Sequence, residues 1–310
     1  MFNPEAVTFV EAGDTCSNRD VIRCNWQADA GPGSYCRSCA MTEIIPQSVA
    51  GKNVALWDDA ERAKRWVLSN LGQWGWMSDR DTGLRPRFHL LSEETSEGPA
   101  AIIMGHDSGL ITINVTEADP AVRVARREEL AERYRTLVGH FRHEIGHYVF
   151  LRLVTNKGFA ADFRDMFGDE RADYGAALKR HYEQGPPNDW WVHHVTPYAS
   201  AHPHEDWAET FAHLLHLTDM VDSFQASDFS ARAAHIGRLD PYKTKNSAAL
   251  ISGGIEIGIG MNHVNRSMGL FDLYPFVLSI EAREKLEFVH NWVRSAIEGK
   301  PKRKRPKRAK

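Results

Sequence analysis

Two histidines one helical turn apart form the pattern in this sequence that most strongly suggests chemistry. His143 and His147 flank Glu144 within HFRHEIGHYVF, residues 140–150. In a helix, residues four apart project from the same face, so both imidazoles can reach a single metal ion. The neighbouring residues are largely apolar, which predicts that the histidines point inward, where they need partners. The pattern therefore predicts a metal site on a buried helix.

Zinc fits this donor set. Zn²⁺ held by two imidazoles and one further protein ligand keeps a position for water, whose pKa it lowers to about 7. Glu144 lies beside the histidines and could take the proton of this water, which is the HExxH arrangement of zinc peptidases. The alternative is a pair of core histidines with ordinary hydrogen-bond partners. A third ligand would decide in favour of the metal.

We expect the third ligand downstream, on another helix. The metzincin pattern needs Gly at 150 and His at 153, and Phe150 and Leu153 exclude that class. The segment YASAHPHEDWAETFAHLLH instead offers Glu205 and Glu209 one turn apart, so Glu205 could bind the metal while Glu209 accepts a hydrogen bond from a ligating histidine. This spacing favours a glutamate zincin. Competing ligands are Asp169, Asp173, His202 and His204.

Other polar residues near these segments have less direct roles. Tyr198 comes seven residues before Glu205, and its phenol could donate a hydrogen bond to the oxyanion that forms during amide hydrolysis. A tyrosine that only packs in the core is the alternative. Three further histidines are expected to pack or to support the ligands: His140, His213 and His216.

The four cysteines all lie near the start of the sequence, at Cys16, Cys24, Cys36 and Cys39. No secretion signal precedes them, so disulfides are disfavoured, and the CRSC segment places two thiolates where one tetrahedral Zn²⁺ could bind both. A structural zinc site is the interpretation that we favour. Free thiols or a redox pair are the alternatives.

Charge is distributed unevenly along the 310 residues. Of 38 Lys and Arg residues, eight fall in the last eleven positions, KPKRKRPKRAK, which leaves 30 to face 41 acidic residues elsewhere. This balance argues against a nucleic-acid-binding face on the globular part. The tail is expected either to be a disordered solubility segment or to make a weak contact with nucleic acid or an acidic partner. With no long apolar run, a soluble cytoplasmic protein is expected.

The spacing of apolar residues and the positions of Gly and Pro predict the helices and strands that position these residues. Residues 1–50 are rich in Gly, Asp, Asn and Cys and are expected to form a zinc-ribbon-like region. Residues 51–299 are expected to form the main domain, and residues 300–310 the tail. Strands are expected at 101–104 and 110–115, and an irregular stretch around KTKNSAALISGGIEIGIGMNH. Helices are expected at 56–72, 120–154 (with a break near Arg133), 159–182, 203–220 and 279–297. This order predicts a mainly helical α+β fold with its sheet at one side.

Several blocks of the sequence resemble the bacterial zinc-binding metallopeptidase family that carries an N-terminal zinc-ribbon region. They are GLITINVTEAD, YRTLVGHFRHEIGHYVF, FGDERADYGAALKRHYEQGPPNDW, YASAHPHEDWAETFAHLLH and NRSMGLFDLYPFVLS. The resemblance extends from the cysteines to about residue 295. Many family members carry an additional CxxC ahead of the cysteines found here, whereas CNW and CRSC match the second cysteine cluster of the family.

The segment from Tyr198 to Asp219 is also similar to the catalytic domain of anthrax lethal factor, a gluzincin. The resemblance implies a zincin-like fold and zinc bound by His143, His147 and Glu205. It also implies that Glu144 is the general base and Tyr198 the donor to the transition state, with Glu209 supporting the ligands.

The function expected from the sequence is zinc-dependent hydrolysis of peptide bonds, with Glu144 taking a proton from zinc-bound water. The polar face of strand 110–115 is a candidate edge for an extended peptide substrate. The alternative is a zinc-stabilised module that binds nucleic acid or a partner, in which the HExxH metal is structural.

Overall fold

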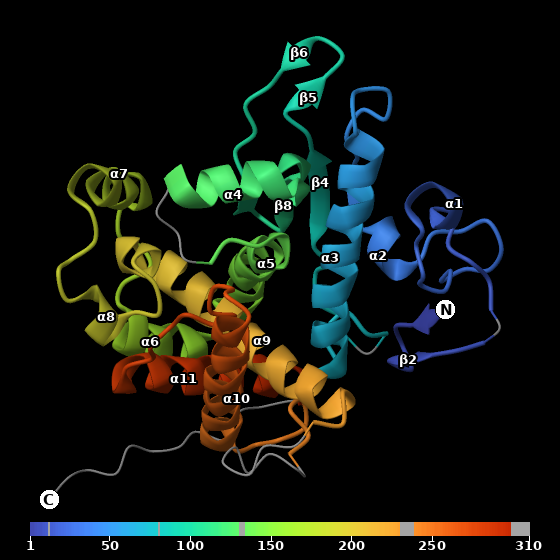
Figure 1. Cartoon of the computed structure of the whole chain (residues 1–310). Helices are drawn as coiled ribbons and strands as arrows, with labels where there is room; N and C mark the ends of the chain where they lie inside the picture. The colour runs from blue at the N-terminus through green and yellow to red at the C-terminus, as the bar shows by residue number, and fades with distance from the viewer. Residues whose placement is uncertain (12, 80, 130–133, 230–238, 299–310) are drawn as a thin grey trace, which may run out of the picture.

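A four-stranded sheet lies at one side of the main helices (Figure 1). The computed structural model describes residues 1–298 except 12, 80, 130–133 and 230–238. The strands are β1 (Phe2–Asn3), β2 (Thr8–Phe9), β3 (Thr42–Ile44), β4 (Arg87–Leu91), β5 (Glu94–Thr95), β6 (Gly98–Pro99), β7 (Gly105–Asp107) and β8 (Leu110–Asn114). The first helices are α1 (Arg19–Ile22), α2 (Arg37–Ala40), α3 (Asn53–Gln73), the 3₁₀ helix η1 (Val115–Ala118) and α4 (Pro120–Glu129).

The remaining helices follow the sheet in sequence. They are α5 (Leu137–Leu153), α6 (Lys157–Phe167), α7 (Tyr174–Gln184), α8 (Trp190–His193), the 3₁₀ helix η2 (Tyr198–Ala201), α9 (Pro203–Ala226), α10 (Ser247–Ser267) and α11 (Ile280–Glu298). Within the described ranges, no helix has the length and apolar character needed to cross a membrane. This architecture confirms the predicted α+β class, mainly helical with a small sheet and a cysteine cluster near the N-terminus.

The main sheet is mixed, in the order β3-β4-β8-β7. β4 pairs in parallel with both β3 and β8, whereas β7 pairs antiparallel with β8. β3 and β7 are the two outer strands. Period-two alternation buries Phe88 and Leu90 of β4 and Ile111 and Ile113 of β8, because one face of the sheet packs on the helical core. β7 and β8 both contact α5, so the β7 edge of the sheet lies beside the helix that carries the HExxH pattern.

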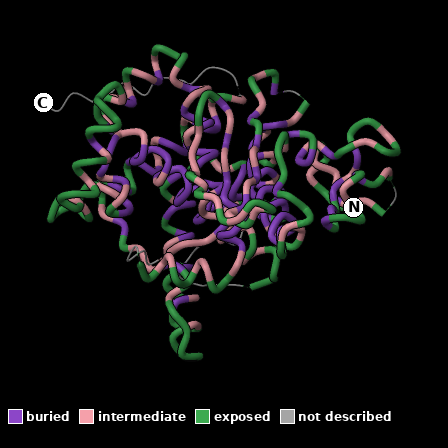
Figure 2. The backbone as a smooth tube through the Cα atoms, turned by 90° about the horizontal axis from the view of Figure 1, so that it is seen from above, coloured by how far each residue is buried: buried purple, intermediate pink, exposed green. Residues whose placement is uncertain are grey.

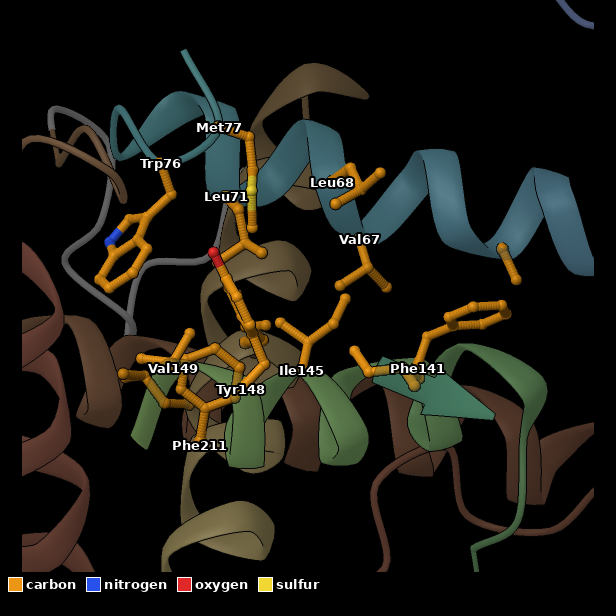
Figure 3. Packing of buried hydrophobic residues seen from close by; sticks show 14 of the residues in the cluster. Val67, Leu68, Leu71, Trp76, Met77, Phe141, Ile145, Tyr148, Val149 and Phe211 are labelled. Carbon is orange, nitrogen blue, oxygen red and sulfur yellow. The ribbon is translucent and has the colours of Figure 1, made fainter. Parts of the chain in front are cut away.

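Three helices from distant parts of the sequence enclose the centre of the core. α5 packs against both α3 and α9. Figure 3 shows Val67 and Leu71 of α3 pointing toward Ile145 and Tyr148 of α5, with Phe211 of α9 on the far side of that helix. Burial concentrates at this centre and falls toward the periphery (Figure 2). Because α5 is enclosed from two sides, its polar residues have to be accommodated inside the molecule.

Several predicted elements differ from those observed. The strand expected at 101–104 is wrong, since β7 begins at Gly105, and β3 and β4 were not predicted. The helix expected at 159–182 is two helices, because Gly168 at the end of α6 has a φ of 97° that stops the first. The stretch expected to be irregular forms α10. The break near Arg133 and the basic tail at 300–310 lie outside the described residues.

Candidate metal centre

The histidines of the HExxH pattern meet on α5. The helix begins after Thr136, whose side chain accepts a hydrogen bond from the Gly139 N–H at 2.9 Å and caps the first turn. His143 and His147 follow one turn apart, with 3.1 Å between their Nε2 atoms. The two imidazoles therefore converge on one point.

α9 brings a carboxylate to the same point. His202 caps this helix and Pro203 occupies its first position, which places Glu205 in the first turn. Glu205 is 1% exposed. Its Oε2 lies 3.1 Å from His143 Nε2, and its Oε1 lies 3.5 Å from His147 Nε2. One ligand atom from each of the three side chains lies within 4.8 Å of the other two.

The polar atoms at the centre of this cluster fit a cation. Glu205 Oε2 is buried and has no hydrogen-bond partner within the described part of the chain. Buried polar atoms without partners are costly, and a metal ion would satisfy this one. Two imidazole nitrogens and one carboxylate oxygen are the donor set of many catalytic zinc sites, which keep a fourth position open. The donor set thus matches the ion that the sequence predicts.

The electrostatics of the cluster favour positive charge among these groups. Burial disfavours the charged form of His143, but the nearby carboxylates of Glu205 and Glu209 outweigh it and raise the pKa of His143 well above the ordinary value. Burial also disfavours the Glu205 carboxylate, yet the two imidazoles more than compensate and hold its pKa well below the ordinary range. A proton and a metal ion would compete for this position.

Glu209 contacts the far side of one imidazole. Its Oε1 lies 2.7 Å from His143 Nδ1, and its Oε2 accepts a hydrogen bond from Thr196 Oγ1 at 2.7 Å. With Nδ1 donating to Glu209, the lone pair of neutral His143 is at Nε2, which faces His147 and Glu205. The carboxylate therefore fixes both the ring orientation and the tautomer that a metal requires.

The remaining residues predicted for chemistry lie close to this cluster. Glu144 is 8% exposed, and its Oε2 has no hydrogen-bond partner among the described residues. Tyr198, in η2, has its ring centroid 6.0 Å from that of His143. Burial and the Glu205 carboxylate raise the pKa of the Tyr198 phenol, so it stays protonated and can donate a hydrogen bond.

The competing ligands all have other partners. Asp173 caps α7 by accepting from the Ala176 N–H, and Asp169 pairs with exposed Arg171. His202 Nδ1 accepts from the N–H of His204. The His204 ring packs edge-on against Phe150, with centroids 4.7 Å apart. Among the described residues, only two groups have metal-binding spacing: the cluster around Glu205 and the four cysteines.

The three histidines that were expected to pack or to support the ligands contact residues outside the cluster. His140 Nε2 lies 3.7 Å from buried Glu117. His213 Nδ1 lies 2.7 Å from the Tyr274 hydroxyl. His216 contacts the guanidinium of Arg142, which also pairs with Asp219. These contacts fit the expected roles in packing the core and in supporting the candidate ligands.

The cysteines form a second, separate cluster. All four are buried and free, at Cys16, Cys24, Cys36 and Cys39. Cys24 Sγ lies 3.7 Å from Cys36 Sγ and 3.8 Å from Cys39 Sγ. These distances are far too long for disulfides, but four thiolates at about 2.3 Å from one zinc ion would be about 3.8 Å apart. The cluster therefore fits a tetrahedral site with no open position.

Sequence reasoning missed three residues beside the cluster of His143, His147 and Glu205. Tyr174, the first residue of α7, donates a hydrogen bond from its hydroxyl to Glu205 Oε1 at 2.7 Å. Thr196 contacts Glu209 as described above. His106 of β7 stacks on His147, with centroids 6.2 Å apart and an angle of 15° between the rings. None of them has a fixed spacing from the HExxH residues, so no sequence signal identified them.

Known proteins are similar to this chain over most of its length. Residues 53–292 match the family described as "Putative zinc-binding metallo-peptidase". An uncharacterized protein of Mycobacterium tuberculosis (strain H37Rv) and one of Mycobacterium bovis (strain AF2122/97) are each 39% identical over 287 residues. Those alignments cover 90% of this chain and 82% of each relative. No solved structure gives a significant match. The chain belongs to the zinc-binding metallo-peptidase family.

Proposed function

We propose that the protein is a zinc-dependent peptidase of the gluzincin type, with His143, His147 and Glu205 as zinc ligands and Glu144 as general base. The observation that carries this proposal is the convergence of three ligand atoms within 4.8 Å. Beside them on α5 lies Glu144, whose Oε2 has no hydrogen-bond partner in the part of the chain that the structure describes. A site that served only to stabilise the fold would be closed by a fourth protein ligand, as the cysteine cluster is.

Zinc bound at this site would supply Lewis-acid chemistry, lowering the pKa of a water molecule and polarising the substrate carbonyl. Side chains of the protein carry out the other steps. Glu144 Oε2 takes a proton from the attacking water and passes it to the nitrogen of the leaving amine. The Tyr198 hydroxyl donates a hydrogen bond to the carbonyl oxygen as negative charge develops there.

The strand that an extended substrate would pair with is β7. The sequence suggested residues 110–115, but β8 is an inner strand with β4 on one side and β7 on the other. Asn114 of β8 is 1% exposed and caps η1 through the Thr116 N–H, so its replacement would disturb the fold itself. β7 is one of the two outer strands of this sheet, and its His106 stacks on His147, so a peptide added there would lie beside the cluster.

The four cysteines complete the proposal with a structural zinc site. Their cluster is buried in the same apolar core as α3. Its four thiolates would occupy all positions of a tetrahedral ion, so it would stabilise the N-terminal region and carry out no chemistry.

The test is Glu144→Gln, which keeps the size of the side chain and removes the base. We expect hydrolysis of a quenched fluorescent peptide library to fall at least about 100-fold. Zinc content should not change. Glu183→Gln is the matched control, because Glu183 lies on α7 and its exposed side chain pairs with exposed Lys179 at 3.8 Å. Full activity of Glu144→Gln would show that the residue is not the base.

A further inference from the structure

Tyr174 reaches the buried carboxylate of Glu205 from a peripheral helix. It is the first residue of α7, a helix whose only buried residue among those described is Ala177. Tyr174 itself is 43% exposed. Its hydroxyl nevertheless lies 2.7 Å from Glu205 Oε1 and donates a hydrogen bond to it. An exposed helix is thus linked directly to a candidate metal ligand.

This hydrogen bond makes the two oxygens of Glu205 different. Oε1 has Tyr174 as a partner, while Oε2 has none among the described residues and lies 3.1 Å from His143 Nε2. A carboxylate held by one oxygen keeps the other oxygen aimed in a fixed direction.

A third residue fixes both partners of the hydrogen bond. His202, the N-cap of α9, lies three residues before Glu205. Its Nε2 lies 3.1 Å from the carbonyl oxygen of Ala172, just before α7. Its ring packs edge-on against the ring of Tyr174, with centroids 5.2 Å apart and an angle of 82°. The start of α7 and the first turn of α9 are therefore held in a fixed position relative to each other.

We propose that Tyr174 is a positioning residue that orients Glu205 for metal binding, so that metal occupancy and the docking of α7 stabilise each other. This inference rests on the proposed function only in requiring a cation at His143, His147 and Glu205. It assigns Tyr174 a role distinct from that of Tyr198, since Tyr174 acts on a ligand and Tyr198 on the substrate.

The test compares Tyr174→Phe with Tyr182→Phe in the full-length protein. Both changes remove one hydroxyl from α7, but Tyr182 is 71% exposed. The measurement is the affinity of the site at His143, His147 and Glu205 for zinc, by chelator competition. The zinc that the cysteine cluster would hold is subtracted. We expect the Kd to rise about 10- to 100-fold for Tyr174→Phe and to stay unchanged for Tyr182→Phe. The visible absorption of the cobalt-substituted protein should shift for Tyr174→Phe alone.

A double variant separates positioning from a general effect on folding. In the Glu205→Ala background, adding Tyr174→Phe should not change the weak residual zinc affinity further, because its target is gone. A further loss of the same size would overturn the inference. So would a Tyr174→Phe protein with wild-type Kd and cobalt spectrum, which would leave the proposed function standing. A wild type without zinc at this site would overturn both.

Discussion

Two glutamates near His143, Glu144 on α5 and Glu209 on α9, have different surroundings, and this difference fits different roles. Glu209 has partners at both oxygens, His143 Nδ1 and the Thr196 hydroxyl. A carboxylate held in this way orients its neighbour and cannot easily exchange protons. Glu144 Oε2 has no partner in the described part of the chain. The carboxylate of Glu144, with one oxygen that has no partner among the described residues, is thus the one that fits the proposed role of base.

Tyr198 should affect the chemical step alone. Its phenol is 6.0 Å from His143, centroid to centroid, and does not belong to the ligand cluster. Tyr198→Phe should therefore lower kcat about 100- to 1000-fold while KM and zinc content change little, because only the hydrogen bond to the developing oxyanion is lost. Steady-state kinetics with a peptide substrate would measure this. A variant whose KM rises at unchanged kcat would instead place Tyr198 in substrate binding.

For single residues, the spacing of candidate ligands along one helix could be predicted from the sequence, whereas their contacts with residues of other helices could not. His143 and His147, and Glu205 and Glu209, are each four apart, so helix geometry alone puts each pair on one face. That α5 and α9 meet was inferred from the need for a third ligand. Tyr174 is 31 residues from Glu205, and no local rule links two such positions.

The packing of α5 on α9 sets the geometry of the cluster. Gly146 lies between the two histidines, and a Cβ there would come within 3.0 Å of Ala208 Cα and 3.1 Å of Phe211 Cδ1. The Trp207 indole N–H donates to the Gly146 carbonyl at 2.8 Å. The absence of a side chain at Gly146 thus lets the ligand helices approach closely.

Gly146→Ala should separate these helices. We expect it to lower the free energy of unfolding by about 1–3 kcal/mol and to weaken zinc binding, because backbone atoms of α9 would have to shift. Gly260→Ala is the control, since a Cβ at this exposed helical glycine meets nothing within 4 Å and should be neutral or stabilise by up to about 1 kcal/mol. Urea unfolding measures both. Equal stability of the two variants would refute the close-approach argument.

The same reasoning explains the helix that the sequence did not predict. α10 contains SGGIEIGIG, and glycines in such number are typical of irregular structure. In the fold, a Cβ at Gly254 would come within 3.0 Å of Leu217 on α9, and one at Gly258 within 3.4 Å of Tyr274. These glycines permit close packing, and that purpose becomes visible only when the partner helix is in place.

For the whole molecule, buried histidines link stability to pH. His213 is 3% exposed, and burial lowers its pKa to about 4, from an ordinary value of 6.5. The folded state therefore holds it neutral. A group with a depressed pKa of this kind contributes its full stability above pH 6.5 and loses it as the pH falls toward 4, because the unfolded state takes up the proton first.

Replacing His213 with Gln should reduce this dependence. Between pH 7.5 and pH 5, we expect the free energy of unfolding of the metal-free wild type to fall by about 2 kcal/mol more than that of His213→Gln. Gln is chosen because its amide oxygen can still accept a hydrogen bond from Tyr274. Denaturant titrations at several pH values provide the comparison. Parallel curves for the two proteins would mean that His213 titrates normally.

The two clusters of metal-binding geometry lie in different parts of the molecule. The cysteines are in the N-terminal region, next to α3, and the cluster around Glu205 lies between α5 and α9. Figure 1 shows α1 and α2 on the opposite side of α3 from α5. Loss of one ion should therefore leave the other bound.

The most direct measurement is the zinc content of wild type, Glu205→Ala and Cys36→Ser, each purified without added metal and measured by elemental analysis. We predict two zinc ions per wild-type chain and one in each variant, with peptide hydrolysis lost only in Glu205→Ala. If Glu205→Ala retained both ions, or if the wild type held no zinc, the assignment of His143, His147 and Glu205 as a catalytic zinc site would be contradicted.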